Sequence, residues 1–184
     1  MDIRKTIIPS ILALTAGAGL TSCLSDDDKS FDYKGWMNEN ETYFTRMTDT
    51  IGADGNKVYE KLTPVWAPGV YVLARWHNDR SLTASNLVPM DNSTVDVVYQ
   101  GAYYNGTVFD SSFLEKDSVR SFSPNTTVVG FWTMLTNMHV GDSVTCVIPQ
   151  NAGYGASSSS ILPYSTLVFN IKLKAIKAYE IPSK

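Results

Sequence analysis

One segment near the middle of the chain restricts the fold more than any other part of the sequence. Val95–Gly101 is rich in β-branched residues, which is typical of a strand. Asn105-Gly106 follows closely, and this dipeptide tolerates the positive φ angles that a two-residue type I′ turn requires. We therefore expect a β-hairpin, whose second strand carries Phe109 and Asp110, an aromatic ring and a carboxylate side by side.

Further patterns extend this hairpin into a domain. Four apolar residues recur with helical spacing and predict a short amphipathic helix: Phe131, Met134, Leu135 and Met138. Strands are indicated at residues 69–76, 144–148 and 167–173, the last with strict alternation of apolar and mostly polar residues. Several antiparallel strands and one short helix predict an α+β fold, in which a curled β-sheet (a half-barrel) wraps over the helix. We assign this domain to residues 69–184.

The segment before this domain has a different pattern. Four large apolar side chains share one face of a helix that we expect over residues 33–47: Trp36, Tyr43, Phe44 and Met47. Pro64 and Pro68 then mark an irregular link. Residues 33–68 are therefore predicted to be an N-terminal helical extension.

The first 22 residues are typical of a targeting segment. A basic pair precedes the apolar run Ile7–Leu20, which is too short to span a bilayer comfortably. The run ends in Leu20-Thr21-Ser22-Cys23, which resembles the lipobox of bacterial lipoproteins. This resemblance implies cleavage before Cys23 and acylation of that cysteine, which would anchor the protein in a membrane. An ordinary secretory signal is the alternative.

Residues 23–32 follow as an acidic tether. The run of like charges at 26–28 cannot bury itself, so we expect a solvated segment. It resembles the acidic export signal of Bacteroidetes surface lipoproteins, which implies an outer-membrane lipoprotein of the cell envelope, exposed at the surface. Removal of residues 1–22 would take the formal net charge from −3 to −4. This acidic balance argues against nucleic acid as a partner.

Few residues of the mature chain are suited to covalent or metal chemistry. Cys146 is the only cysteine besides Cys23, and it lies within a predicted strand, where a packing role is expected. No disulfide framework or metal-ligand spacing can be built from the remaining residues. His77 and His139 are the only histidines, and neither lies in a nucleophile motif.

Four sequence blocks, in order, resemble the FKBP-type peptidyl-prolyl isomerases. The first is Val-x-Tyr-x-Gly followed by Phe-Asp-Ser-Ser, ending at Ser112, and the second is Phe122–Phe131. The third, Ile148–Gly155, is similar to the family's I-P-x-x-x-A-Y-G, and the fourth, Ile161–Phe169, to its I-P-P-x-(A/S)-T-L-x-F. Together they span about residues 95–176, roughly half of the mature chain.

This resemblance implies a site and an activity. The side chains expected to line a prolyl pocket are Tyr99, Phe109, Val128, Phe131, Ile161 and Phe169. Asp110 and Tyr154 would be the polar groups at its rim, and the N–H of Val128 would bind a substrate carbonyl. The implied function is cis-trans isomerisation of X-Pro bonds in proline-containing polypeptides, assisting the folding of envelope or secreted proteins, by a monomer.

Such a reaction requires no nucleophile, metal or cofactor. Rotation about an X-Pro bond is slow because amide resonance must be broken, at about 18–20 kcal/mol. The planar amide is more polar than the twisted transition state, so an apolar aromatic pocket destabilises the ground state more. A thousandfold acceleration needs only about 4 kcal/mol.

Other interpretations of the same residues stay open. Each aromatic residue of the set is also an ordinary core residue, and Asp110 is also suited to cap a turn through Ser111 or Ser112. Departures from the family pattern at Gly153, at Leu162 and in the shortened loop 156–160 bear on activity more than on fold. The alternative functions are a cell-surface peptide- or ligand-binding module of FKBP fold with little turnover, and a structural lipoprotein with a filled pocket.

Overall fold

The computed structural model describes residues 31–115, 117–156 and 161–179. Its contacts divide the chain after residue 31, and the second, compact unit begins at residue 32. The predicted signal segment 1–22, the lipidation site Cys23 and most of the tether 23–32 lie outside the described residues. None of the helices in the described ranges is long and apolar enough to cross a membrane.

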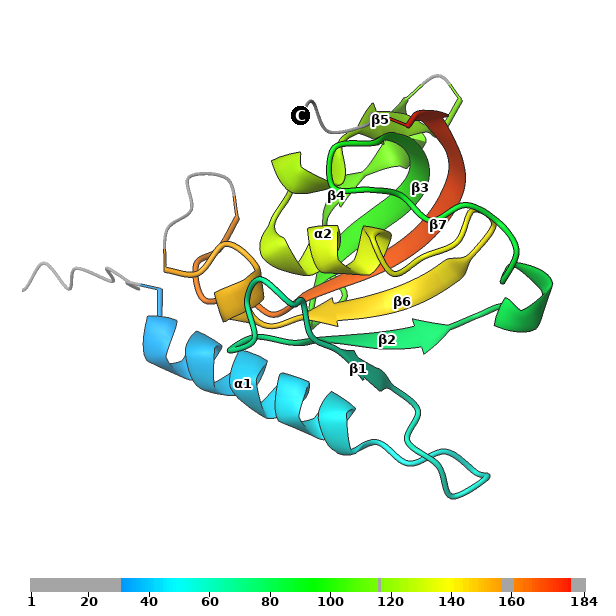
Figure 1. Ribbon diagram of the computed structural model, residues 1–184. Coiled ribbons are helices and arrows are strands. Elements are labelled where there is room, and N and C mark those ends of the chain that lie inside the picture. The colour runs from blue at the N-terminus through cyan, green and yellow to red at the C-terminus, as the bar shows by residue number, and fades with distance from the viewer. Residues whose placement is uncertain (1–30, 116, 157–160, 180–184) are drawn as a thin grey trace, which may run out of the picture. The chain divides into compact units, whose positions relative to one another are not determined.

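The second unit is built on one antiparallel β-sheet of seven strands (Figure 1). The strands are β1 (Glu60–Leu62), β2 (Val72–Trp76), β3 (Thr94–Tyr103), β4 (Val108–Ser111), β5 (Arg120–Phe122), β6 (Ser143–Ile148) and β7 (Leu167–Ala178). They run in the order β1-β2-β6-β7-β3-β4, and β5 pairs with β3 beside β4. The described fold is thus α+β with an open, curled sheet, as the sequence predicts.

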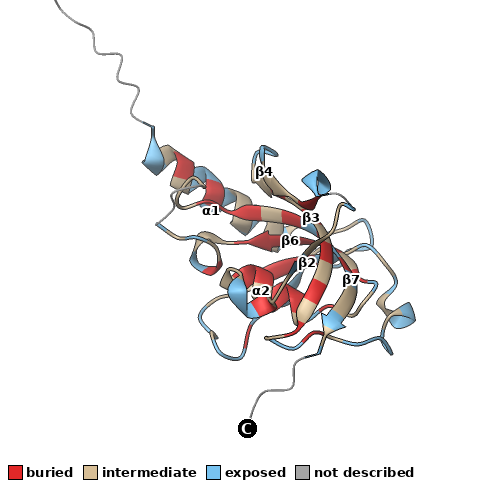
Figure 2. Cartoon of the chain, turned by 90° about the horizontal axis from the view of Figure 1, so that it is seen from above, coloured by how far each residue is buried: buried red, intermediate tan, exposed pale blue. Residues whose placement is uncertain are grey.

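Two α-helices accompany the sheet: α1 (Tyr33–Asp49) and α2 (Val129–Leu135). Short 3₁₀ turns lie at η1 (Arg80–Leu82), η2 (Ser112–Leu114), η3 (Pro124–Thr126) and η4 (Gln150–Ala152). Helix α2 contacts β2 and β6, and Figure 2 shows buried residues along α2 and the strands that it faces. All four residues of the predicted stripe are buried in the main core, but the helix is shorter than predicted: α2 ends at Leu135, and Met138 lies beyond it.

The strand patterns are confirmed in detail. Every second residue of β7 from Leu167 to Leu173 is buried, while Asn170, Lys172 and Lys174 are exposed. Strand β6 is buried along almost its whole length. It carries Cys146, a free, fully buried thiol whose pKa burial raises well above its usual value. Cys146 is therefore a packing residue, as expected.

The predicted hairpin exists, but its turn differs from the prediction. Tyr103 and Thr107 are joined by a hydrogen bond of 2.9 Å from the Tyr103 N–H to the Thr107 carbonyl, which leaves three residues in the loop. Only Gly106 among them has a positive φ, of 87°. A type I′ turn would require Asn105 to adopt one too. The chain instead uses a three-residue loop, and glycine at its last position fits that geometry.

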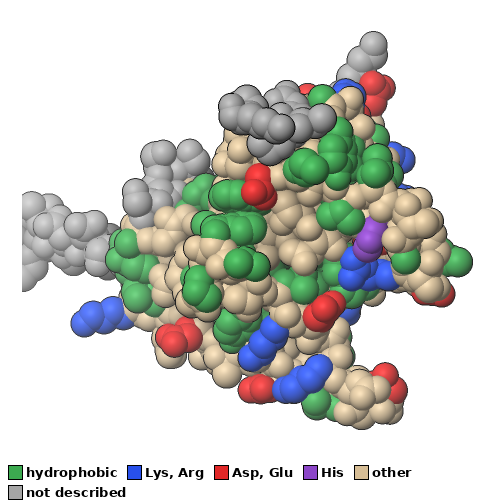
Figure 3. All heavy atoms as spheres, viewed as in Figure 1, with side chains coloured by type: hydrophobic (Ala, Val, Ile, Leu, Met, Phe, Trp, Pro, Cys, Tyr) green, Lys and Arg blue, Asp and Glu red, His purple; other side chains and the backbone are tan. Residues whose placement is uncertain are grey.

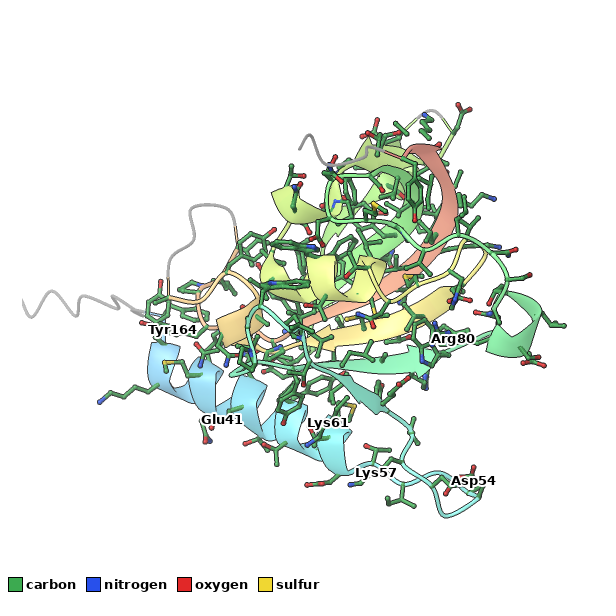
Figure 4. The ribbon with its side chains drawn as sticks, in the orientation of Figure 1. Glu41, Asp54, Lys57, Lys61, Arg80 and Tyr164 are labelled. Carbon is green, nitrogen blue, oxygen red and sulfur yellow. The ribbon has the colours of Figure 1, made fainter. Side chains whose placement is uncertain are left out.

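Helix α1 is confirmed and is hydrogen-bonded to the segment that directly precedes β7. The Trp36 indole N–H donates hydrogen bonds to the Pro163 carbonyl (3.1 Å) and to Ser165 Oγ (3.2 Å). Asn40 is 2% exposed, and its Oδ1 accepts from the Thr166 N–H at 2.6 Å. Figure 4 shows Tyr164 beside the first turn of α1. The segment 33–68 therefore packs within the same compact unit as residues 69–184, and it also supplies β1.

A buried carboxylate fixes the connection between α2 and β6. Asp142 is fully buried and accepts hydrogen bonds from Thr83 Oγ1 (2.5 Å), Asn78 Nδ2 (3.0 Å), Arg80 Nε (3.2 Å) and the His139 N–H (2.9 Å). Figure 4 places Arg80 at the far end of β2. Burial alone would raise the pKa of Asp142, but these donors and the Arg80 charge outweigh it and hold that pKa below its usual value.

Candidate active site

A cavity of about 460 Å³ opens between α2, the sheet and the loop after η4. Its lining combines aromatic rings with a charged rim: Tyr99, Asp110, Arg120, Phe122, Thr126, Thr127, Val128, Phe131, Tyr154 and Phe169. Strands β3, β4, β5 and β7 contribute side chains, as do η3 and α2. A mostly apolar cleft with a few convergent polar groups is the usual form of a small-molecule or peptide site.

Four aromatic rings form the interior of the cavity. The Phe131 ring, on α2, lies 4.9 Å from the Phe169 ring at an interplanar angle of 74°. The Tyr99 ring lies 5.7 Å from Phe131 at 72°, and Phe122 lies 5.7 Å from Phe131 as well. Edge-to-face contacts of this kind hold rings in fixed positions. The floor is therefore built before any ligand arrives.

The rim carries a connected group of polar side chains. The Tyr99 hydroxyl donates to Asp110 Oδ2 at 2.6 Å, and Arg120 Nη1 donates to Asp110 Oδ1 at 3.1 Å. Arg120 also donates to the Tyr99 hydroxyl oxygen, while its Nη2 lies 3.2 Å from Glu115 Oε1. The Asp110 side chain remains 41% exposed. The carboxylate is thus fixed in orientation yet accessible from the cavity.

Both tyrosines of the cavity are held neutral. Burial, followed by the hydrogen bond and the negative charge of Asp110, raises the pKa of Tyr99 far above its usual value. Burial and, less strongly, the Asp110 charge also raise the pKa of Tyr154. Both phenols therefore keep their protons throughout the physiological pH range and can serve as hydrogen-bond donors.

The wall opposite the rim is formed where η3 meets α2. Val128 directly precedes α2, and its carbonyl accepts the first helical hydrogen bond from the Trp132 N–H at 3.0 Å. Among the described residues, no hydrogen bond has the Val128 N–H as its donor. As at any helix start, this leaves a backbone donor that a ligand oxygen can use.

Six of the eight residues expected at the site line the cavity together; Phe109 and Ile161 do not. The Phe109 ring packs behind the lining, 5.6 Å from Phe169 and 5.1 Å from Tyr103. It occupies a bulge, since Asp110 pairs with Gly101 and Val108 with Ala102. Ile161 is half-buried against the core. Phe109 therefore supports the wall rather than forming it.

Gly101 explains why the rings of Phe169, in the floor, and Phe109, behind it, fit against β3. A Cβ at this position would lie 2.5 Å from Phe169 Cε1 and 2.9 Å from Phe109 Cζ. Only glycine allows both rings to approach the backbone of β3 so closely.

Four residues that line the cavity were not predicted from the sequence. Arg120 and Phe122 lie on the three-residue strand β5, which is too short for alternation to be recognised. Thr126 and Thr127 belong to η3 and its cap, where no apolar pattern exists. Within the described ranges, no group of three or more His, Cys, Asp or Glu side chains is arranged to hold a metal ion.

Comparisons with known proteins agree with this geometry. The family model for FKBP-type peptidyl-prolyl cis-trans isomerase matches residues 86–174. The chain is 38% identical over 91 residues to the FKBP-type 22 kDa peptidyl-prolyl cis-trans isomerase of Escherichia coli (strain K12), covering 48% of this chain and 44% of that protein. It is 36% identical over 91 residues to the macrophage infectivity potentiator of Trypanosoma cruzi, covering 48% and 46%.

Solved structures show the same fold. The crystal structure of FkpA from Escherichia coli superposes with a TM-score of 0.63 at 24% identity, covering 81% of this chain and 62% of that one. The chain spans about half the length of the curated relatives that it matches. The family-model match begins after β2, so α1, β1 and β2 lie outside it.

Proposed function

Because residues 86–174 form a domain of the FKBP-type peptidyl-prolyl cis-trans isomerase family, we propose that this chain catalyses the cis-trans isomerisation of X-Pro bonds in polypeptides. The observation that carries the proposal is the cavity itself. It joins a floor of four packed aromatic rings to a rim where Asp110 is bound by Tyr99 and Arg120.

The aromatic floor suits the chemistry of amide rotation. In the proposed complex the proline ring of the substrate occupies the cavity, out of water, against Phe131 and Phe169, which line it. The planar amide carries more charge separation than the twisted one, so its transfer from water to an apolar cavity favours the transition state. The barrier of about 18–20 kcal/mol falls without any covalent step. Lowering it by about 4 kcal/mol accelerates rotation about a thousandfold.

The rim and the Val128 wall hold the flanking backbone while the bond turns. The Tyr154 hydroxyl and the Val128 N–H donate hydrogen bonds to carbonyl oxygens of the substrate. Asp110, kept in place by Tyr99 and Arg120, presents a negative charge beside the rotating amide. Such positioning restricts rotation to the X-Pro bond and requires no cofactor.

We further propose that the protein works as a monomeric lipoprotein of the cell envelope, bound to the outer membrane through an acylated Cys23. The lipobox-like sequence and the acidic tether support this location. Its substrates would then be secreted or outer-membrane proteins during folding. Metabolic labelling with a fatty acid, compared between the natural chain and Cys23→Ala, tests the anchor: label that persists in Cys23→Ala would contradict it.

Catalysis can be tested directly by NMR exchange spectroscopy on short X-Pro peptides. We expect the full chain carrying Cys23→Ala to accelerate exchange, and Phe131→Ala or Asp110→Ala in the same background to reduce it at least tenfold. Phe113→Ala removes an exposed ring outside the cavity and serves as the matched control. Equal exchange in the control and in Phe131→Ala would contradict the proposed site. Peptide binding at Tyr99 and Tyr154 without catalysed exchange would indicate a binding module instead.

A further inference from the structure

Two tryptophans stack on each other beside the cavity. The Trp66 ring lies 4.4 Å from the Trp132 ring at an interplanar angle of 27°. Trp66 is 46% exposed and its neighbour Val65 is 94% exposed. Figure 3 shows hydrophobic side chains gathered on this face, in front of α2 and the loop before β2. We refer to Val65, Trp66 and Trp132 as the aromatic shelf.

The shelf is continuous with the cavity. Trp132 lies four residues after Val128, on the same face of α2, and its N–H donates to the Val128 carbonyl at 3.0 Å. A second link runs through Asp91, whose carboxylate accepts from the Trp132 indole N–H at 2.6 Å. The Asp91 carbonyl accepts from the Asn125 N–H at 2.9 Å, next to the cavity wall at Thr126.

The shelf is held in place by the chain around it. Pro64 is buried, and the turn that carries Trp66 is closed by hydrogen bonds from the Ala67 N–H to the Pro64 carbonyl (3.1 Å) and from Val70 to Ala67 (3.2 Å). The Trp132 ring is fixed by Asp91. A rigid, exposed pair of indoles loses little freedom on binding, which is the property of strong contact sites.

We propose that the aromatic shelf binds one apolar side chain of the same polypeptide whose proline occupies the cavity. This inference rests on the proposed function and adds a sequence preference to it. The backbone rises about 6 Å along the helix axis from Val128 to Trp132, and Trp66 stacks on Trp132 at 4.4 Å, so the shelf begins roughly 6 to 10 Å from Val128. An extended chain advances about 3.3 Å per residue. The apolar residue therefore lies about three positions from the proline.

The size of the shelf favours a peptide side chain over a second folded protein. Three side chains present at most a few hundred Å², whereas a stable protein–protein interface buries about 800 Å² on each partner. One aliphatic or aromatic side chain covers a surface of this size. The Trp66 half of the shelf comes from a segment that precedes the family-model match at residues 86–174.

The test compares two ten-residue peptides with one X-Pro bond, which differ only in carrying leucine or serine three positions from the proline. The full chain carrying Cys23→Ala provides the reference, without acyl chains that would occupy apolar surfaces. We expect the ratio of kcat/KM for the leucine peptide to that for the serine peptide to fall about fivefold to tenfold in Trp66→Ser. Leu82→Ser, which removes a more exposed apolar residue from η1, should keep the ratio of the reference.

Each outcome decides the proposal. The proposal is overturned if the kcat/KM ratio is the same in the reference and in Trp66→Ser, both when leucine precedes the proline and when it follows it. If neither peptide is turned over, the proposed function fails. The shelf is then tested by comparing the ratio of the two peptides' dissociation constants between the reference and Trp66→Ser. Loss of binding to phosphatidylcholine vesicles in Trp66→Ser, with an unchanged peptide ratio, would assign the shelf to a membrane surface and overturn the proposal as well.

Discussion

Tyr99 and Asp110 lie on adjacent strands, β3 and β4, and their side chains are joined by a hydrogen bond of 2.6 Å. Arg120 from β5 binds the same carboxylate, so three strands orient one charged group.

Replacement of Asp110 should reduce catalysis more than stability. Asp110→Asn keeps a hydrogen-bond acceptor for the Tyr99 hydroxyl but removes the charge beside the rotating amide. Because the side chain is 41% exposed, we expect little change in the melting temperature and about a tenfold loss of kcat/KM, or about 1.4 kcal/mol at the transition state. Peptide exchange by NMR and thermal unfolding of the same sample measure both. Asp54→Asn, in an exposed turn, is the control; a melting temperature that falls with the activity would contradict this separation.

Gly101→Ala should destabilise the domain, because Gly101 lies against two packed aromatic rings at the cavity. The new methyl group would overlap the Phe169 and Phe109 rings at 2.5 and 2.9 Å, and both rings are packed against others. Overpacking of this kind typically costs about 1–3 kcal/mol. Urea unfolding followed by tryptophan fluorescence measures the loss. Gly69→Ala meets nothing within 4 Å and should change the free energy of unfolding by less than about 0.5 kcal/mol; equal effects of the two substitutions would refute the packing argument.

Asn40→Ala should destabilise the protein although it lies outside the cavity. The amide accepts from the Thr166 N–H (2.6 Å) and donates to the Trp36 carbonyl (2.7 Å). Removal of a buried partner leaves the Thr166 donor unsatisfied, which costs about 1–3 kcal/mol. Asn38→Ala on the exposed face of α1 is the matched control. Equal unfolding free energies for the two variants would show that the Asn40 side-chain hydrogen bonds add no net stability.

Asp142 should make the stability depend on acid pH. Its pKa is lower in the folded state than in the unfolded state, where a carboxyl titrates near pH 3.9. The ionised form therefore stabilises the fold fully above that value, and this contribution is lost as the pH falls through the lower folded pKa. Asp142→Asn keeps the shape of the side chain but removes its charge. We therefore expect the natural chain and this variant to differ in unfolding free energy by a constant amount from pH 6 to 8. Below about pH 4 this difference should shrink. A difference that is constant down to pH 2 would contradict this role.

The sequence predicted those parts of the fold that are encoded by long, regular patterns. The buried stripe of α2 and the alternation in β7 each involve several residues, and both patterns are confirmed. Strands β1 and β5 have three residues each, too few for a period of two to be recognised. Their pairing is decided by neighbouring strands, and Arg120 was missed at the site for that reason.

Three further differences arise from tertiary structure. Asn105-Gly106 favours a two-residue turn locally, but the hairpin accommodates a third loop residue, with Tyr104 in contact with Trp36 and Tyr43 on α1. Asn40 is polar and its burial could not be read from helical periodicity, since its partner, Thr166, lies 126 residues away. Phe109 carries the family motif, yet the bulge in β4 turns it behind the cavity.

The contact between α1 and the segment before β7 has a consequence for biogenesis. Asn40 and Thr166 are separated by most of the chain, and β7 pairs with both β3 and β6. Contacts of such long sequence separation form late, because the intervening loop must be closed first. A chain that is made or exported from its N-terminus therefore cannot complete this sheet until its last strand has emerged. Until then β3 and β6 lack their common neighbour, so a nascent or truncated chain would itself require protection from aggregation.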